Sequence, residues 1–454
     1  MEYQIPRIII AGTGSGCGKT TVTCAVLAAL YKRGLNVGAF KCGPDYIDPM
    51  FHKHILGTPS SNLDSFFFDS NTINWLLVKN GSDKEICVIE GVMGYYDGAG
   101  CNSTKASSHE ISQITHTPVI LVLNAKGAAL SLLAVIQGFL TFFPENNICG
   151  LILNQCTDMT YSILAEAVNS RFGGSIKMLG YLPPMPECSL ESRHLGLITA
   201  QEVSDLDRKI TILGEQAEKA IDLDGLIKLS ARTVNLSCDP VSVPSFPEPV
   251  RIAVAKDNAF CFYYHDNLNI LSEMGAEIVP FSPLSDILLP ENIHGIYLGG
   301  GYPELYAEKL SKNYSMKRGI LQALESGIPC IAECGGFMYL TDSIEDLPMI
   351  SYLPGKCYNT HKLTRFGYIH LKADRDNMLC SKDEKFPAHE FHYWDCEATG
   401  TDFTAEKLSG KHWKCIYAND HLYAGYPHFH FYAKPELAIN FYKACLRFKE
   451  KQNV

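Results

Sequence analysis

Short runs of hydrophobic residues alternate with stretches of helical periodicity along the first half of the chain. The runs occupy residues 7–11, 37–40, 86–89, 119–123, 148–153 and 178–182. After the first run, one face of a predicted helix is formed by Val22, Ala25, Val26, Ala29 and Leu30. Gly34 then predicts the end of that helix. Short apolar strands that alternate with amphipathic helices indicate a mainly parallel sheet covered by helices on both faces.

A proline-rich segment with little periodicity interrupts this pattern at residues 238–249, and we interpret it as a linker. It contains Pro240, Pro244, Pro247 and Pro249. Beyond it the alternation resumes, with strands predicted at residues 251–255, 277–280, 295–298 and 328–332 and helices near residues 267–274, 305–325 and 337–340. The chain has 454 residues, which is too many for one ordinary core. We therefore predict two α/β domains, over residues 1–237 and 250–454.

Composition and charge narrow the classes of function. Apolar residues make up 46% of the chain and charged residues 19%, which is typical of a globular protein. The net charge of −10, without a basic stripe, argues against a nucleic-acid partner. The apolar run at residues 8–10 is far too short for a signal peptide or a membrane span, so we expect a cytoplasmic protein with no membrane partner. The 17 cysteines include no C-x-x-C pair, so we expect reduced thiols.

A glycine-rich loop follows the first predicted strand and precedes the first predicted helix. It reads Gly-Thr-Gly-Ser-Gly-Cys-Gly-Lys-Thr at residues 12–20, a context in which backbone N–H groups cradle the phosphates of a nucleotide. We expect Lys19 to reach the β- and γ-phosphates of ATP and Thr20 to bind Mg²⁺. The residues expected at the phosphates are Gly12, Gly14, Gly16, Gly18, Lys19, Thr20 and Thr21. The first glycine stands one residue earlier than in G-x-x-x-x-G-K-T, and this longer form is similar to the dethiobiotin synthetase group, which phosphorylates carboxylates.

Two acidic clusters follow predicted strands, at the edge where open α/β sheets bind ligands. Asp45 and Glu90 are the predicted Mg²⁺ ligands beside Thr20, because Mg²⁺ takes one or two carboxylates together with phosphate oxygens. Asp48 and Asp97 are predicted either to bind the metal or to orient a substrate. Lys41 is predicted to neutralise a transferring phosphoryl group.

One further polar residue lies at a strand end. Asn154 ends the run at residues 148–153, and it is either an adenine ligand or a turn-forming asparagine.

A second site is indicated around Cys334. This cysteine follows the predicted strand at residues 328–332 and precedes two glycines and a short helical pattern, which is typical of a nucleophile elbow. We expect the helix N-terminus to lower the pKa of the thiol, and a histidine to accept its proton. His428 is the preferred base and His430 the alternative, since residues two apart on a strand share a face. The alternative for Cys334 itself is a buried structural thiol.

The glycines after the predicted strand at residues 295–298 complete this second site. Gly300 and Gly301 are expected to donate backbone N–H groups to an oxyanion. A chain with both sites can activate a carboxylate with ATP and release ammonia from an amide. The combination predicts glutamine-dependent amidation.

Five stretches resemble signatures of the cobyrinic acid a,c-diamide synthase family: residues 40–49, 90–98, 193–197, 259–264 and 389–393. The resemblance runs over nearly the whole chain, and Gly-Pro-Asp-Tyr-Ile-Asp-Pro and Phe-x-Phe-Tyr-Tyr are its most specific parts.

It implies an N-terminal P-loop synthetase domain, dethiobiotin-synthetase-like, and a C-terminal flavodoxin-like class I glutamine amidotransferase domain. It also implies that ATP phosphorylates the a and c acetate carboxylates of a corrin and that ammonia from L-glutamine displaces the phosphate. A Cys–His pair is then expected to suffice. No His-x-Glu follows Gly425, and the chain has His430 where other class I enzymes carry the third member of the triad.

The alternatives share parts of this chemistry. Nickel-sirohydrochlorin and hydrogenobyrinic acid a,c-diamide synthases resemble the same family throughout, so the tetrapyrrole stays open. A P-loop regulatory ATPase of the partitioning type would carry a second lysine early in the loop, where this chain has Thr13 and Gly14, and would not need Cys334. The sequence leaves the oligomeric state open, with a homodimer among the options.

Overall fold

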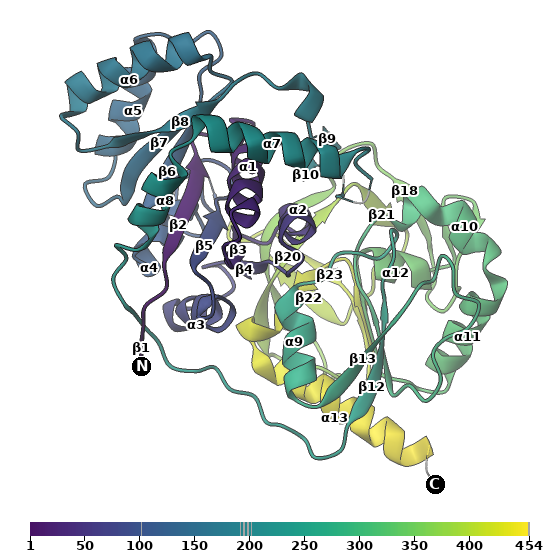
Figure 1. Cartoon of the computed structure of the whole chain (residues 1–454). Helices are drawn as coiled ribbons and strands as arrows, with labels where there is room; N and C mark the ends of the chain where they lie inside the picture. The colour runs from purple at the N-terminus through teal and green to yellow at the C-terminus, as the bar shows by residue number, and fades with distance from the viewer. Residues whose placement is uncertain (101, 191, 194–195, 198, 201, 453–454) are drawn as a thin grey trace. The chain divides into compact units, whose positions relative to one another are not determined.

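The computed structural model describes residues 1–100, 102–190, 192–193, 196–197, 199–200 and 202–452. The chain forms two compact units, Met1–Val241 and Ser242–Val454 (Figure 1). The division falls inside residues 238–249, all of which are described and none of which is in a helix or strand. In the signature stretch at residues 193–197, His194 and Leu195 lie outside the described residues. No helix in the described ranges is long and apolar enough to cross a membrane.

The first unit contains a seven-stranded, entirely parallel sheet with the strand order β4-β3-β5-β2-β6-β7-β8. Its strands are β2 (Arg7–Gly12), β3 (Val37–Cys42), β4 (Ser61–Leu63), β5 (Ile86–Glu90), β6 (Val119–Asn124), β7 (Ile148–Asn154) and β8 (Lys177–Leu182). Every residue of β2 and β5 is buried, so both faces of the sheet are covered. The predicted parallel α/β architecture is confirmed, with β4 as an additional strand.

The helices of this unit alternate with the strands. They are α1 (Lys19–Lys32), α2 (Ile47–Leu56), α3 (Ser70–Gly81), α4 (Ser108–Ile114), α5 (Ser131–Thr141), α6 (Asp158–Phe172), α7 (Leu206–Ala220) and α8 (Leu223–Ser230). Short elements complete the unit: β1 (Glu2–Tyr3), β9 (Ser192–Arg193), β10 (Gly196–Leu197), β11 (Leu236–Ser237) and the 3₁₀ turn η1 (Pro186–Cys188). Helix α1 ends as predicted, because Gly34 adopts φ +81° and lets the N–H of Leu35 reach the carbonyl of Leu30.

The second unit contains a six-stranded sheet with the order β13-β12-β14-β15-β25-β24, parallel except for the edge strand β24. Its strands are β12 (Val250–Ala255), β13 (Ala276–Phe281), β14 (Gly295–Leu298), β15 (Cys330–Glu333), β24 (Tyr417–Ala418) and β25 (Leu422–Gly425). The helical elements are α9 (His265–Glu273), η2 (Pro303–Tyr306), α10 (Ala307–Lys312), α11 (Tyr314–Glu325), α12 (Gly335–Leu340), η3 (Phe431–Ala433) and α13 (Pro435–Gln452). This confirms a second α/β domain.

The single helix predicted near residues 305–325 is wrong. Asn313 separates α10 from α11, because its side-chain oxygen accepts from the N–H of Met316 while its amide nitrogen donates to the carbonyls of Pro283 and Asp286. These bonds give the asparagine a cap role in place of a helix interior.

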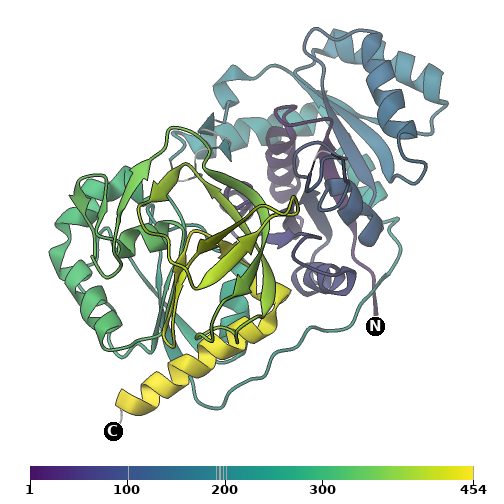
Figure 2. The same ribbon diagram turned by 180° about the vertical axis from the view of Figure 1, so that it is seen from behind.

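The sequence did not predict two further sheets formed by strands that follow α12 (Figure 2); their neighbouring strands are antiparallel except for β16 and β18, which are parallel. One sheet has the order β23-β22-β19-β20-β26 and the other β17-β16-β18-β21. Their strands are β16 (Ser343–Ile344), β17 (Leu347–Pro348), β18 (Lys356–Asn359), β19 (Arg365–Ala373), β20 (Lys385–His392), β21 (Trp394–Cys396), β22 (Phe403–Glu406), β23 (His412–Cys415) and β26 (His428–Phe429). Strand β26 carries His428 and pairs with β20, so the five-stranded sheet holds the predicted base in place.

Candidate active sites

The glycine-rich loop connects β2 to α1 in a conformation that glycine makes possible. Gly18 adopts φ +96°, and a Cβ added there would lie 1.8 Å from the side-chain nitrogen of Asn154. Gly14 and Gly16 lie in the more exposed part of the loop, and Thr21 lies in the first turn of α1. No described side chain caps the N-terminus of α1, so its first backbone N–H groups are free of a cap and suited to a phosphate.

The loop lysine folds back over the loop. Lys19 is buried, and its Nζ donates to the carbonyl of Gly14 at 3.2 Å. Burial lowers the pKa of Lys19. Among the described residues, no carboxylate lies within ion-pair distance of this ammonium, so an anionic ligand is the partner that would favour its charge.

A buried carboxylate organises the neighbouring polar groups. Glu90 Oε1 accepts from Thr20 Oγ1 at 2.6 Å and from Lys41 Nζ at 3.2 Å, and Glu90 Oε2 lies 2.7 Å from His52 Nε2. Burial opposes the charge of Glu90, but Lys41 and His52 outweigh it and hold the pKa of Glu90 well below its usual range. Glu90 is therefore an anion at neutral pH, positioned beside the hydroxyl of the loop.

Lys41 is enclosed by two carboxylates. Its Nζ lies 2.5 Å from Asp48 Oδ2 and 3.2 Å from Glu90 Oε1, and it donates to the carbonyl of Gly91 at 2.9 Å. Burial opposes the charge of Lys41, but Asp48 and Glu90 outweigh it and raise the pKa of this ammonium. Burial and the charge of Glu90 raise the pKa of Asp48, whose Oδ1 also lies 3.5 Å from Thr20 Oγ1.

The remaining candidates of this unit have more local roles. Asp45 Oδ1 accepts from the N–H of Ile47 at 2.7 Å, and the charge of Asp45 raises the pKa of Lys41. Asp97 is exposed, and its Oδ2 accepts from the N–H of Gly94 at 2.8 Å.

Asn154 holds the glycine-rich loop. Its Nδ2 donates to the carbonyl of Cys17 at 3.0 Å, a contact that neither of its two predicted roles included.

In the structure, Thr20 and Lys41 each contact both carboxylates of the cluster, Asp48 and Glu90. His52 was not predicted from the sequence; it is fully buried and also contacts Ser60 Oγ at 3.1 Å. Its only sequence signal is a polar residue in the helix that follows the first acidic cluster. In the part of the chain that the structure describes, no three or more His, Cys, Asp or Glu side chains gather to hold a metal ion.

In the second unit, Cys334 stands at a sharp turn between β15 and α12. It adopts φ +48° and ψ −104°, a conformation that a residue with a side chain rarely takes. The turn is held because the N–H of Cys334 donates to the carbonyl of Gly425 at 2.7 Å. A Cβ at Gly336 would lie 2.2 Å from the carbonyl oxygen of Leu298, so the helix starts against β14 only with a glycine there. This is the geometry of a nucleophile elbow.

The expected lowering of the thiol pKa by the helix is wrong. Burial, and after it the charge of Glu304, raises the pKa of Cys334, and the N–H of Gly335 offsets this only in part. Helix α12 has six residues, so its dipole is weak beside the cost of a buried thiolate. The thiol therefore needs a base to take its proton.

His428 lies beside the predicted oxyanion glycines. A Cβ at Gly300 would lie 2.6 Å from His428 Cε1 and 3.3 Å from its Nε2, and on the other side of the ring Nδ1 lies 3.2 Å from Glu333 Oε2. Burial lowers the pKa of His428 to about 3, so the ring is neutral and able to accept a proton. His430 differs, because its Nδ1 accepts from the N–H of Tyr432 at 3.2 Å and its ring packs on Tyr264.

The aromatic signature at residues 259–264 supports this site. Tyr263 accepts from the N–H of Gly299 at 2.8 Å, and the carbonyl of Gly300 accepts from the N–H of Phe262. Gly301 adopts φ +152°, and its nitrogen lies 3.2 Å from the position of a Cβ at Gly335. The glycine loop is therefore fixed against the elbow.

The signature at residues 389–393 lies next to the predicted base His428. His389 Nε2 lies 2.8 Å from the hydroxyl of Tyr264, and its ring centroid is 5.2 Å from that of His428. The ring of His392 stacks on that of Tyr426, with 4.0 Å between the ring centroids. These buried side chains pack around the predicted base His428.

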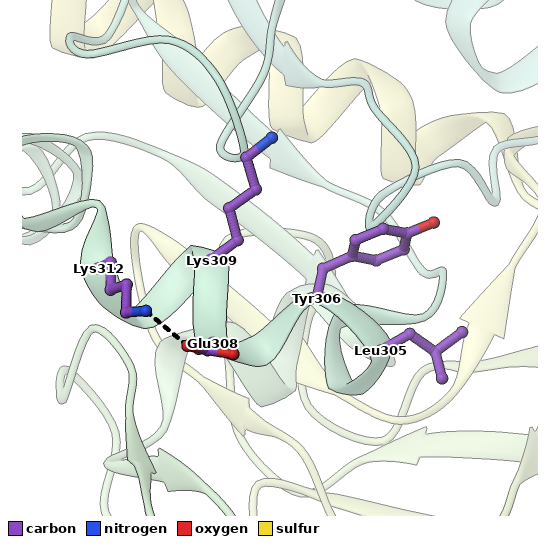
Figure 3. A pocket seen from close by; sticks show the side chains of 5 residues that line it. All are labelled: Leu305, Tyr306, Glu308, Lys309 and Lys312. Carbon is purple, nitrogen blue, oxygen red and sulfur yellow. Dashed lines mark hydrogen bonds and ion pairs between the residues drawn. The ribbon is translucent and has the colours of Figure 1, made fainter.

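A separate hollow of about 300 Å³ lies on η2 and α10 (Figure 3). It is lined by Leu305, Tyr306, Glu308, Lys309 and Lys312, and Lys312 pairs with Glu308. None of the predicted site residues lines it.

Comparison with known proteins covers both units. A family profile for the CobQ/CobB/MinD/ParA nucleotide binding domain matches residues 8–198, and one for the CobB/CobQ-like glutamine amidotransferase domain matches residues 251–436. The solved PurLQS structure from Thermotoga maritima is 16% identical, covers 44% of this chain and 98% of its own, and has a TM-score of 0.30.

Two curated relatives match almost end to end. The cobyrinate a,c-diamide synthase of Clostridium acetobutylicum is 40% identical over 97% of this chain and 99% of its own length. That of Listeria innocua serovar 6a is 40% identical over 97% of this chain and 100% of its own. The chain therefore belongs to the cobyrinate a,c-diamide synthase family.

Proposed function

We propose that this protein is an amidoligase that converts the a and c acetate carboxylates of cobyrinic acid to amides, with ATP and L-glutamine as co-substrates. The observation that supports the proposal is that each unit of the chain holds its own group of side chains suited to one of the two reactions. One is the Thr20–Lys41–Asp48–Glu90 cluster beside the glycine-rich loop, and the other is the Cys334 elbow with His428. The two full-length relatives are cobyrinate a,c-diamide synthases by name.

In the first unit, the loop amides and Lys19 would bind the phosphates of ATP. A carboxylate oxygen of the tetrapyrrole attacks the γ-phosphorus, the bond to the β-phosphate oxygen breaks, and an acyl phosphate and ADP result. Lys41 lies where a cation can offset charge on the transferring group, and Asp48 and Asp97 are candidates to orient the substrate. Asn154, which supports the loop, stays a candidate for contact with adenine.

The residues present fit Mg²⁺ together with phosphate oxygens. Thr20 and Glu90 present oxygens next to the loop, and the charge of Asp45 acts on the neighbouring Lys41; Mg²⁺ would supply charge neutralisation of the β- and γ-phosphates.

In the second unit, His428 takes the thiol proton and the sulfur of Cys334 attacks the side-chain amide carbon of glutamine. The N–H groups of Gly300 and Gly301 are candidates to stabilise the oxyanion. Ammonia leaves with the proton from His428, and water hydrolyses the thioester to glutamate. Ammonia then displaces phosphate from the acyl phosphate and forms the amide.

The test uses purified protein with ATP, Mg²⁺ and glutamine and one tetrapyrrole at a time: cobyrinic acid, hydrogenobyrinic acid or nickel-sirohydrochlorin. We expect ATP hydrolysis and a diamide product, identified by mass spectrometry, with cobyrinic acid. Diamidation of only one of the other two would move the assignment to that substrate. ATP hydrolysis that no tetrapyrrole stimulates, without amide formation, would favour a regulatory ATPase.

A further inference from the structure

The carboxyl group of Glu333 occupies an unusual place in the second unit. Glu333 is the last residue of β15, immediately before Cys334, and its side chain is 2% exposed. Acidic side chains are almost never buried to this extent without a partner. The described residues offer Glu333 no lysine or arginine in ion-pair distance, and its ion-pair partner there is His428, with Oε2 3.2 Å from Nδ1.

Three tyrosines interact with this carboxyl. Its charge raises the pKa of Tyr263 beside the glycine loop, of Tyr297 on β14 and of Tyr423 on β25, after the larger effect of burial in each case. Burial raises the pKa of Glu333. The hydroxyl of Tyr297 and the backbone N–H of Phe429 lower it, but they offset the effect of burial only in part. A positive charge on the imidazole of His428 is therefore what would stabilise the ionised form of Glu333 most.

The two edges of the His428 ring face different groups. Nδ1 faces Glu333, while Cε1 and Nε2 lie against Gly300 in the predicted oxyanion loop. An ionised Glu333 accepts from Nδ1–H, which fixes the tautomer in which Nε2 is unprotonated. A base in that tautomer can take a proton from a thiol on the Gly300 side.

We propose that Glu333 is the positioning residue of the glutaminase site, holding His428 in the orientation and tautomer that accept the proton of Cys334. The residue two beyond His428 is His430, so a carboxylate supplied from the position before the nucleophile fills the role of the third triad member. In the step, the S–H bond of Cys334 breaks and the Nε2–H bond forms. The Nδ1–H group keeps its hydrogen bond to Glu333, whose negative charge stabilises the imidazolium.

The inference rests on the proposed glutaminase function, and the test separates the two. Glu333→Gln keeps the size of the side chain and removes its charge, Glu333→Asp keeps the charge, and Glu325→Gln on the exposed end of α11 is the matched control. For each full-length variant, kcat and KM for glutamine hydrolysis are measured beside ammonium-dependent amidation. If the wild type shows no ammonium-dependent amidation, the proposed function is contradicted. The role of Glu333 is tested separately, by comparing kcat for glutamine hydrolysis in each variant with that of the wild type.

We expect Glu333→Gln to lower kcat for glutamine hydrolysis by about 10²–10³-fold with KM nearly unchanged, because proton acceptance and not glutamine binding is affected. Ammonium-dependent amidation should stay at the wild-type rate, and Glu333→Asp should recover part of kcat. A normal kcat in Glu333→Gln, or a higher KM with kcat unchanged, would overturn the proposal.

A measurement on the wild type covers the case in which Glu333→Gln does not fold. The ¹⁵N chemical shifts of labelled histidines, with His428→Gln used to assign the signal, report which nitrogen of His428 carries the proton. The Nδ1–H tautomer is expected, and the Nε2–H tautomer would contradict the proposed role.

Discussion

Glu90→Gln is the sharpest perturbation of the synthetase site, because the substitution keeps shape and removes one buried charge. The glutamine oxygen can still accept from Thr20 and Lys41, and its amide group can face His52. Lys41 then keeps Asp48 as its partner at 2.5 Å, so it is not left unpaired. We therefore expect the free energy of unfolding to fall by about 2 kcal/mol, which is the contribution of one charge-assisted hydrogen bond. Breaking a whole buried ion pair would cost more.

The effect on synthesis should be larger than the effect on folding. Removing one preorganised electrostatic contact at a reacting centre costs about 3 kcal/mol of transition-state stabilisation, roughly 10²-fold in rate. Loss of the carboxylate that would bind Mg²⁺ beside Thr20 adds to this, so amidation with either glutamine or ammonium should fall by at least about 10²-fold.

The assay follows ammonium-dependent amidation, basal glutamine hydrolysis and thermal unfolding of the same preparation. Glu166→Gln, on the exposed side of α6, is the matched control and should behave as wild type. Glutamine hydrolysis at Cys334 should survive in Glu90→Gln because that chemistry belongs to the other unit. Near-normal amidation in Glu90→Gln would remove Glu90 from the metal site and refute the placement of the acidic cluster.

Three further results are expected. Asp45→Asn should lower amidation as Glu90→Gln does if Asp45 binds metal; a raised tetrapyrrole KM with kcat intact would place it in the substrate pocket. His428→Ala should reduce glutamine hydrolysis by about 10²–10⁴-fold and His430→Ala much less, and the reverse order would reassign the base. Glutamine hydrolysis by the wild type should rise with pH through about 8, where burial has raised the pKa of Glu333, because only the ionised form accepts from Nδ1–H of His428; an identical rise in Glu333→Gln would contradict this.

The parts of the fold predicted from sequence are those that local patterns determine. The apolar runs at residues 7–11 and 86–89 became parallel strands in which every residue is buried, and Gly34 ended α1 through its left-handed backbone. Asn313 was missed because its cap depends on the carbonyls of Pro283 and Asp286, about 30 residues away in the chain.

The site was predicted in the same uneven way. The elbow at Cys334 follows from a local strand–Cys–Gly–Gly pattern, which the backbone angles match. The contacts of His52 with Glu90 and of Glu333 with His428 join residues 38 and 95 positions apart, and neither side chain has a local motif. Such pairs are created by strand order, so they become visible only once the sheets are assembled.

The central claim is that carboxylate activation and ammonia release are separate reactions of the two units. Cys334→Ser tests it most directly, since the hydroxyl keeps the elbow and removes the thiol nucleophile. We expect diamide formation from cobyrinic acid to stop with glutamine and to continue at the wild-type rate with ammonium salt. Glutamine-dependent synthesis that persists, or loss of synthesis from both nitrogen sources in a folded variant, would contradict the account.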